Sequence, residues 1–488
     1  MILVIFFTLI YIISSFHNKN TVKKPVPTNL LIISVDTLRA DHMGVYGYKK
    51  NTTPNIDKWA KDALVFNNVT TSVPMTYPSL LSLMTGKSPS TVKILSNVVG
   101  ELANKLYTTF DRNTPTLANI LKRNDYASAA YVVNKALSSK ASDLDTGFDG
   151  YYTNDYKKYM GINMYSGLEQ YNLDYRAYEK FIDEAGIWLD DHKNSKFFLW
   201  IHLIGPHDPY FPPDDNYKCK YNDKYCSQIK STDFDELNLK RIKIYDYCQP
   251  LQQKSLDDLG IFQTLYDGDI GYTDSLVQRI LNKLKDAGLN GKTTVVLYGD
   301  HGEGFDHDYY LSHSRVLYRS SIRIPLIIKS PNINTNKRST DIAMDNADIL
   351  PTILGILNIP VANIQFDGKD MSKILEGSSN INEQRYFYSV NRSATKFAIS
   401  DERYHFIYST DGSKCNFNSQ KEELYNYIDD PDETDNLAEK QTDTKDKMKN
   451  LLLKYISENN NFSNALYYLE KDKDSNSEDI NRLKSGGY

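Results

Sequence analysis

The chain has 488 residues, 40% hydrophobic and 24% charged, so it is long enough to bury one large core and a smaller second one. Its 57 Lys and Arg residues against 62 Asp and Glu residues give a net charge of -5, which supplies no basic surface for phosphate backbones. Nucleic acid is therefore not expected as a partner.

The chain begins with the apolar run MILVIFFTLIYIISSF. This run is shorter than the roughly 20 residues that usually span a bilayer, and its length suits a signal-peptide core. No small-x-small cleavage site follows it, and the nearest lysines lie after it. We expect residues 1–18 to be a cleaved signal peptide or an uncleaved membrane anchor, with a buried helix as the third alternative. Residues 19–28 are a linker in this interpretation, and the protein is extracytoplasmic: periplasmic, secreted or anchored to the cytoplasmic membrane.

Apolar runs rich in branched residues alternate with amphipathic stretches of helical length. The apolar runs are Asn29–Val35, Ala127–Val133, Phe197–Leu203, Thr293–Tyr298 and Ile324–Ile328, each typical of a buried parallel strand. The amphipathic stretches are Thr53–Leu64, Thr116–Arg123, Tyr175–Leu189 and Tyr272–Leu284. This alternation predicts an α/β fold over residues 29–380, a doubly wound and mostly parallel sheet with helices on both faces.

The pattern changes after the large domain. The segment DILPTILGIL predicts a helix entered through Pro351 that closes this domain. Short strand-like pieces, RYFYSV and FAISDERYHFIYS, then precede an acidic turn and a helix through Leu451–Ile456. We expect a small C-terminal α+β subdomain at residues 381–460 and a frayed polar tail at 461–488.

Four cysteines, Cys219, Cys226, Cys248 and Cys415, would permit disulfides in an oxidising compartment. Cys219 can pair with Cys226. Their spacing lacks the paired CxxC pattern of a zinc site, and four free cysteines remain the alternative.

Acidic and histidine side chains follow two of the predicted strands. Asp36 follows the first strand, and the pair Asp300 and His301 follows another. Ligands gather at the carboxyl ends of strands in open α/β sheets, and two carboxylates with an imidazole suit one divalent cation of intermediate hardness. A single Asp in such a position could also be only a helix cap.

The stretch TSVPMTYPSLLSLMTGKSP places Thr76 at the entrance of a helix that runs to Gly86. A hydroxyl there lies at the positive end of the helix dipole, where an attacking oxygen and an anion are both stabilised. The alternative is that Thr76 or Ser79 only caps the helix.

The order of these motifs resembles the sulfatase family of the alkaline phosphatase superfamily over roughly residues 29–440. The segment LIISVDTLRADHMGVYGYKKNTTPNIDKWAKDALVFNNV is similar to the amino-terminal signature of that family, and IHLIGPHDPYFPP resembles its PHxPY element. YDGDIGYTD, GDHGE, SHSRVLYRSSIRIPLIIKSP, DILPTILGIL and ELYNYIDDPDETDNLA match later landmarks in the same order.

The resemblance implies that Asp36, Asp300 and His301 bind one divalent cation, with Thr76 Oγ as a fourth neighbour and as the nucleophile. The residues do not distinguish Ca, Mg, Mn and Zn. The position after Asp36, often a second metal-binding Asp in the family, is Thr37, and no DxxxH pair for a second metal is found.

Further roles are implied by the same resemblance. Arg39 would steady the nucleophile or the anion, and Lys87, in the MTGK that matches the family's LTGR, is a candidate catalytic residue. His207 and His313 would contact substrate oxygens and protonate the leaving group, a task that suits a pKa near neutrality. Further candidates are Asn134, Lys135, Arg315, Arg319 and His202; the last lies inside a strand and would support a ligand.

The chain departs from the family at the nucleophile. Active sulfatases carry a C/S-x-P-x-R motif whose first residue becomes formylglycine, whereas this chain has Thr76 and Leu80 at the two ends of the motif. A hydrated aldehyde can expel sulfate through its second hydroxyl, but a threonine sulfate ester has no such exit. Thr76 therefore favours phosphorus.

The sequence predicts a sulfatase-like, metal-dependent hydrolase of sulfate or phosphate esters. Its substrate would be an anionic ester of a small molecule, a glycan or a lipid head group. Two alternatives remain: a membrane-tethered transferase of phosphoryl-linked head groups, and a catalytically silent relative that binds anionic glycans.

Overall fold

The structure is a computed structural model. It describes residues 29–459 apart from 93, 96, 98–110, 112, 154–175, 233, 246–250, 334–338, 377–383 and 411–420. The predicted signal or anchor, the linker and the polar tail therefore lie outside the described residues. No helix that the structure describes combines the length and apolar character needed to cross a membrane.

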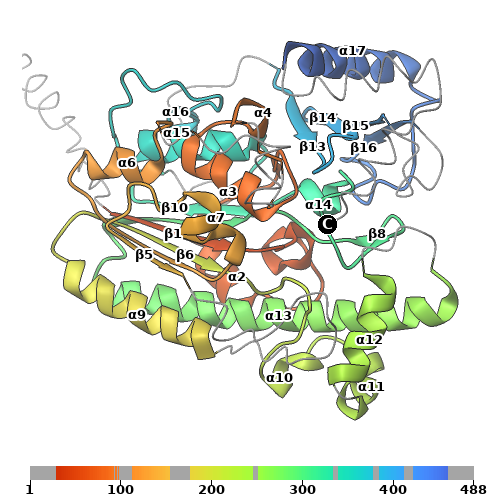
Figure 1. Ribbon diagram of the computed structural model, residues 1–488, viewed down its shortest axis with the longest axis horizontal. Coiled ribbons are helices and arrows are strands. Elements are labelled where there is room, and N and C mark those ends of the chain that lie inside the picture. The colour runs from red at the N-terminus through yellow and green to blue at the C-terminus, as the bar shows by residue number, and fades with distance from the viewer. Residues whose placement is uncertain are drawn as a thin grey trace, which may run out of the picture.

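An eight-stranded sheet in the order β11-β2-β10-β7-β1-β6-β4-β5 forms the centre of the large domain. Five neighbouring strands are parallel to one another. They are β7 (Thr293–Gly299), β1 (Asn29–Val35), β6 (Phe197–Leu203), β4 (Ala127–Val132) and β5 (Gly150–Thr153). Every residue of β1, β6 and β7 is buried, because helices cover both faces of the sheet (Figure 1). The prediction of a doubly wound, mostly parallel sheet is confirmed.

The strand β10 (Leu326–Lys329) corrects one expectation. Its apolar run predicts a buried parallel strand, but β10 runs antiparallel to both β7 and β2 (Leu64–Phe66). Burial on both faces produces the same continuous apolar run in either direction, so composition alone cannot show the direction of a strand. The strand β11 (Ser339–Thr340) then pairs parallel to β2 at the edge.

Two apolar cores lie on the two faces of the sheet. One packs against α2 (Pro54–Ala60), α9 (Arg176–His192) and α13 (Gln253–Asp286), and the other against α3 (Thr76–Thr85), α6 (Leu117–Lys122) and α15 (Asn346–Ile356). Figure 1 shows α13 and α9 below the sheet and α3, α6 and α15 above it. The helix α13 is much longer than the predicted Tyr272–Leu284.

The helix α15 corrects the expectation that Pro351 opens a helix. It begins at Asn346, and Pro351 lies inside it. The side chain of Asp345 accepts hydrogen bonds from the backbone N–H groups of Ala347 and Asp348, and Asp348 bonds back to the N–H of Asp345. This capping box starts the helix before the proline is reached.

The C-terminal part is a four-stranded antiparallel sheet with one helix across it. The strands are β13 (Phe387–Val390), β14 (Lys396–Ser400), β15 (Tyr404–Ser409) and β16 (Glu422–Asn426), in that order, and the helix is α17 (Thr442–Glu458). This is the predicted α+β character. The boundary at residue 380 stays a prediction, because residues 377–383 lie outside the described ones.

The C-terminal sheet also holds the segment that leads into α3. The backbone N–H of Val390 donates to Ser72 O at 2.9 Å, and Ser389 Oγ donates to Thr71 O at 2.8 Å. Val73 and Met75 are buried in one apolar cluster with side chains of β13, β14, β15, β16 and α17. The residues just before Thr76 therefore pack as part of the C-terminal core.

The remaining elements are short or lie in connections. They are α4 (Pro89–Val92), α7 (Ser139–Ser142), α10 (Asp215–Lys218), α11 (Cys226–Ser231), α12 (Phe234–Ile244), α14 (Arg319–Ile322), α16 (Ser372–Leu375), β3 (Val69–Thr70), β8 (Phe305–Asp306), β9 (Tyr309–Tyr310) and β12 (Met344–Asp345), with 3-10 turns at Ala40–His42, Gly44–Tyr46, Lys135–Leu137 and Asp223–Tyr225. Cys219 and Cys226 form a disulfide, as one of the two alternatives predicted. Cys248 and Cys415 lie outside the described residues.

Candidate active site

The predicted metal ligands meet at the carboxyl edge of the central sheet. Asp36 follows β1, and Asp300 and His301 follow β7, the strand beside it. Thr76 is the first residue of α3, whose N-cap is Met75. All four side chains are buried. Parallel neighbouring strands thus bring together residues that are far apart in the sequence.

The distances among these groups are short and similar. Thr76 Oγ1 lies 3.5 Å from Asp36 Oδ2 and 3.5 Å from His301 Nε2. His301 Nε2 lies 3.6 Å from Asp36 Oδ1 and 3.8 Å from Asp300 Oδ2. Ligand atoms of Asp36, His202 and Asp300 all lie within 4.8 Å of one another. We call Asp36, Thr76, His202, Asp300 and His301 the cation cluster.

The cation cluster leaves polar atoms unsatisfied where an ion would bind. Asp36 Oδ1, Asp300 Oδ2 and His202 Nε2 are buried and have no hydrogen-bond partner among the described residues. An unpaired buried polar atom costs about 1–3 kcal/mol, and more for a charged group, so three around one point need an explanation. Their chemistry, two carboxylate oxygens and one imidazole nitrogen, fits a divalent cation.

Burial and charge act on the two carboxylates in opposite ways. Burial would raise the pKa of Asp36, but the charge of nearby His207 holds it below the usual value. The pKa of Asp300 lies well above its usual value, because burial and the neighbouring Asp36 both disfavour a second negative charge. A bound cation would remove this repulsion.

Hydrogen bonds fix the orientation of the groups in the cluster. Nδ1 of His301 lies 2.9 Å from Gly302 O, so Nδ1–H donates there and the Nε2 lone pair faces the cluster. Ser79 Oγ donates to Asp300 O at 2.7 Å and lies 2.6 Å from the hydroxyl of Tyr298. Ser79 therefore ties the first turn of α3 to the end of β7.

Two of the further candidates from the sequence, Asn134 and His202, lie close to Asp36. Asn134 Nδ2 donates to Asp36 Oδ2 at 2.7 Å, while its Oδ1 accepts from the backbone of Ala136 at 2.9 Å. His202 Nε2 lies 3.7 Å from Asp36 Oδ2. The sequence signal for both is their place in or just after a predicted strand, which is a weaker signal than a motif.

His207 and His313 lie beside the cluster and are partly exposed. The ring of His313 is centred 4.2 Å from that of His301 and 5.3 Å from that of His207. Burial lowers the pKa of His313 to about 3, with help from His207, whereas Asp36 and Glu303 raise the pKa of His207 against burial. The two rings therefore differ in how readily they hold a proton.

Glu303 was not predicted. It is fully buried, and its Oε1 lies 3.4 Å from His313 Nδ1. It follows His301 by two residues in GDHGE, and this closeness in sequence to a predicted ligand is the signal that could have identified it.

The structure directs Arg39 and Lys87 to other partners. Arg39 forms ion pairs with Asp41 at 2.7 Å and Asp306 at 2.9 Å, and Lys87 forms one with Asp367 at 3.2 Å. The catalytic roles expected for Arg39 and Lys87 stay predictions, and these contacts do not support them.

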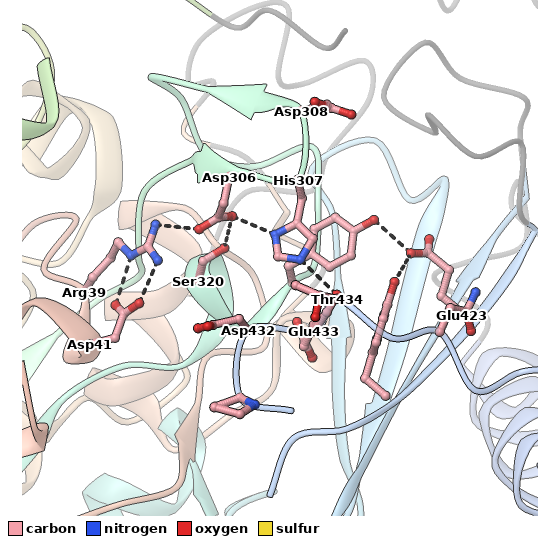
Figure 2. Close-up of a pocket in the computed structure, with 14 residues that line it drawn as sticks. Arg39, Asp41, Asp306, His307, Asp308, Ser320, Glu423, Asp432, Glu433 and Thr434 are labelled. Carbon is pink, nitrogen blue, oxygen red and sulfur yellow. Dashed lines mark hydrogen bonds and ion pairs between the residues drawn. The ribbon is translucent and has the colours of Figure 1, made fainter. Parts of the chain in front are cut away.

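Arg39 lines a cavity of about 450 Å³ between the large domain and the C-terminal sheet. Figure 2 shows the charged groups on its wall, where Asp306 bridges Arg39 and His307. The backbone oxygen of Glu433 lies 3.1 Å from His307 Nε2, and the carboxylate of Glu433 accepts a hydrogen bond from the backbone N–H of Arg319 at 2.7 Å. We call Arg39, Asp41, Asp306, His307 and Glu433 the interdomain network.

Two family models match the chain. The model described as sulfatase matches residues 28–359, and the model described as N-sulphoglucosamine sulphohydrolase, C-terminal, matches residues 306–460. The first alone spans more than half of the chain, and it contains the whole cation cluster.

Relatives and solved structures agree with these matches. The chain is 26% identical over 387 residues to an ulvan-active sulfatase of Formosa agariphila. This match covers 77% of this chain and 70% of that relative. It is 25% identical to an arylsulfatase of Clostridium perfringens, over 88% of this chain and 94% of that one.

Two solved structures share the fold. A protein solved with its substrate D-glucosamine-2-N,6-O-disulfate superimposes with a TM-score of 0.67 at 18% identity, covering 90% of this chain and 98% of its own. The phosphonate monoester hydrolase of Agrobacterium radiobacter gives 0.64 at 18% identity, covering 89% and 96%.

Proposed function

Since the chain belongs to the sulfatase family and is a sulfatase-like hydrolase of sulfate esters, we propose that Thr76 is its nucleophile and that one divalent cation activates it. The observation that carries this proposal is the position of Thr76 Oγ1, 3.5 Å from both Asp36 Oδ2 and His301 Nε2. The cation would be held by Asp36, Asp300 and His301.

A cation bound there supplies positive charge that lowers the pKa of a nearby hydroxyl and stabilises a non-bridging ester oxygen. Thr76 lies in the first turn of a ten-residue helix, where the helix dipole also favours negative charge on its oxygen. Asp36 Oδ2 is within reach of the hydroxyl proton. Thr76 Oγ would then bond to sulfur or phosphorus as the bond to the alcohol oxygen breaks.

The alcohol oxygen needs a proton as it leaves. His207 and His313 are suited to give it, because they lie at the partly exposed side of the cluster. Of the two, His207 is the better donor, since nearby carboxylates raise its pKa while burial and His207 lower that of His313. His313 would instead contact the substrate as a neutral ring, oriented by Glu303.

The second half of the reaction depends on the atom attacked. Water can attack the phosphorus of a phosphoryl-threonine, which breaks the bond to Thr76 Oγ and releases phosphate. A threonine sulfate has no internal exit, so the release of sulfate depends on the same attack of water at sulfur. Phosphoric esters are therefore the second candidate substrate class, on the single ground that Thr76 stands where active sulfatases carry the formylglycine precursor. The transferase and the silent relative gain no support from the sulfatases that the chain resembles.

We further propose that the substrate is an anionic ester on a glycan, because the ulvan-active relative is named for a polysaccharide. An extracytoplasmic site of action follows from the apolar N-terminus and fits a large substrate outside the cell. The disulfide between Cys219 and Cys226 is consistent with an oxidising compartment.

The test is an assay of the purified chain from residue 28 with Mn, Ca, Mg or Zn on p-nitrophenyl sulfate, phosphate and phosphonate side by side. Thr76→Ala should lower turnover by about 10⁴-fold, because the nucleophile is lost. Thr76→Ser, which keeps the hydroxyl, is the matched control and should retain measurable turnover. Activity that survives Thr76→Ala would remove Thr76 from the mechanism, and turnover of sulfate alone would contradict the argument about the exit route.

A further inference from the structure

The imidazole of His202 is oriented with one nitrogen aimed at the cation cluster. His202 lies in β6 beside Ser34 of β1, and its side chain is fully buried. Its Nδ1 lies 2.8 Å from Ser34 Oγ, which also accepts a hydrogen bond from Trp200 Nε1 at 2.9 Å. A hydroxyl oxygen can accept two hydrogen bonds. If Ser34 accepts the Nδ1–H of His202, the Nε2 lone pair is free; if Ser34 donates to Nδ1 instead, Nε2 carries the proton.

The free nitrogen has the spacing of a ligand rather than of a hydrogen-bond donor. His202 Nε2 lies 3.7 Å from Asp36 Oδ2, beyond hydrogen-bond distance, and has no hydrogen-bond partner in the described part of the chain. Bonds of about 2.0–2.2 Å allow two ligand atoms of one ion to lie up to about 4.4 Å apart. His301 Nε2 lies at nearly the same distances, 3.6 Å and 3.8 Å, from the oxygens of Asp36 and Asp300.

Asn134 removes one competing explanation. A histidine beside a carboxylate often serves only to hold it in place, but Asp36 Oδ2 already accepts a hydrogen bond from Asn134 Nδ2 at 2.7 Å. The amide of Asn134 cannot be flipped without losing the bond from Ala136 N to its Oδ1. Asp36 is thus oriented without His202.

We infer that His202 Nε2 is a further ligand of the same cation and that the site selects a transition metal that accepts nitrogen ligands, such as Mn, Co or Zn, over Ca and Mg. Two imidazoles and a hydroxyl beside two carboxylates form a mixed nitrogen and oxygen set. Ca and Mg prefer oxygen donors throughout, whereas imidazole suits transition metals. This inference rests on the proposed cation site and adds the identity of its ion.

The test counts nitrogen ligands directly and needs no substrate. Full-length protein is loaded with Mn²⁺, and electron–nuclear double resonance reports the number of coupled ¹⁴N nuclei. We expect two couplings in the wild type and one each in His202→Gln and His301→Gln. Calorimetry should show Mn²⁺ binding weakened by about 10–100-fold in His202→Gln, with Ca²⁺ binding changed by less than about threefold because Ca²⁺ gains little from imidazole. His192→Gln, which removes a histidine of α9, is the control and should retain both couplings.

The outcomes separate the two proposals. A single coupling in the wild type that disappears in His301→Gln would overturn the role of His202 and leave the cation site standing. Ca²⁺ binding tighter than Mn²⁺ would overturn the inferred selectivity. Absence of any binding by the wild type would overturn the cation site as well. If His202→Gln does not fold, the number of couplings in the wild type still decides.

Discussion

The cation cluster and the interdomain network are both built from buried charged groups, yet they satisfy those groups in opposite ways. In the interdomain network, Asp306 is bonded to Arg39, His307 and Ser320, and Glu433 to His405 and Arg319. In the cation cluster, Asp36 and Asp300 each keep one oxygen with no hydrogen-bond partner among the described residues. Paired charges of the first kind stabilise the packing of two parts of the chain. Unpaired groups of the second kind cost stability, as expected where a ligand would bind.

The largest effect is expected from Asp300→Asn. In the presence of EDTA this variant should be more stable than the wild type by about 1–2 kcal/mol, because it removes a carboxylate buried beside Asp36. Its turnover with metal should fall by about 10³-fold or more, since a ligand is lost. Thermal melts with EDTA and with Mn²⁺, together with initial rates, measure both effects. A lower melting temperature in EDTA would mean that Asp300 is stabilising, and the contrast between the two regions would then be wrong.

Glu433→Gln tests the interdomain network. The carboxylate of Glu433 is buried and bonded to His405 and to the backbone N–H of Arg319, so loss of its charge should lower the free energy of unfolding by about 2–4 kcal/mol. The rate per folded molecule should change by less than about twofold, because Glu433 belongs to the interdomain network and not to the cation cluster. Urea unfolding and initial rates provide the measurements. The exposed Glu439→Gln is the control, and an equal loss of stability there would remove the special role of Glu433.

The smallest effect is a dependence of stability on pH. Asp306 raises the pKa of His307 to about 9 against the effect of burial. Because the folded-state pKa lies above the ordinary value near 6.5, this contribution is fully present below about pH 6.5 and is lost as the pH rises to about 9. We expect a loss of roughly 2 kcal/mol over that range, measured by urea unfolding at several pH values. In His307→Gln this part of the pH dependence should disappear, and an unchanged profile would assign it to another group.

Part of the fold follows from the apolar runs alone. The bounds of β1 and β6 coincide with the predicted Asn29–Val35 and Phe197–Leu203, because strands buried on both faces leave an unbroken apolar signal. The direction of β10 leaves no such signal. The start of α15 was missed because the capping box at Asp345 lies outside the apolar motif that marked the helix.

The candidate site was predicted to a similar extent. The convergence of Asp36, Asp300 and His301 follows from their places after strands, and Thr76 joins them through α3. The contacts of Arg39 could not be predicted, because only the folded structure shows that Asp41 and Asp306 lie close enough to form ion pairs with its guanidinium. His202 was undervalued because a histidine inside a buried strand looks like core until its neighbours across the sheet are known.

The attachment of residues 71–75 to β13 has a consequence for how the chain can be divided. The C-terminal sheet supplies no member of the cation cluster, but it packs against residues 71–75, the segment that leads into Thr76. Separating the two sheets would remove these contacts and leave the position of Thr76 less constrained, even though every residue of the cation cluster would be retained. We therefore expect the part of the chain that carries the cation cluster to lose activity when it is separated from the C-terminal sheet.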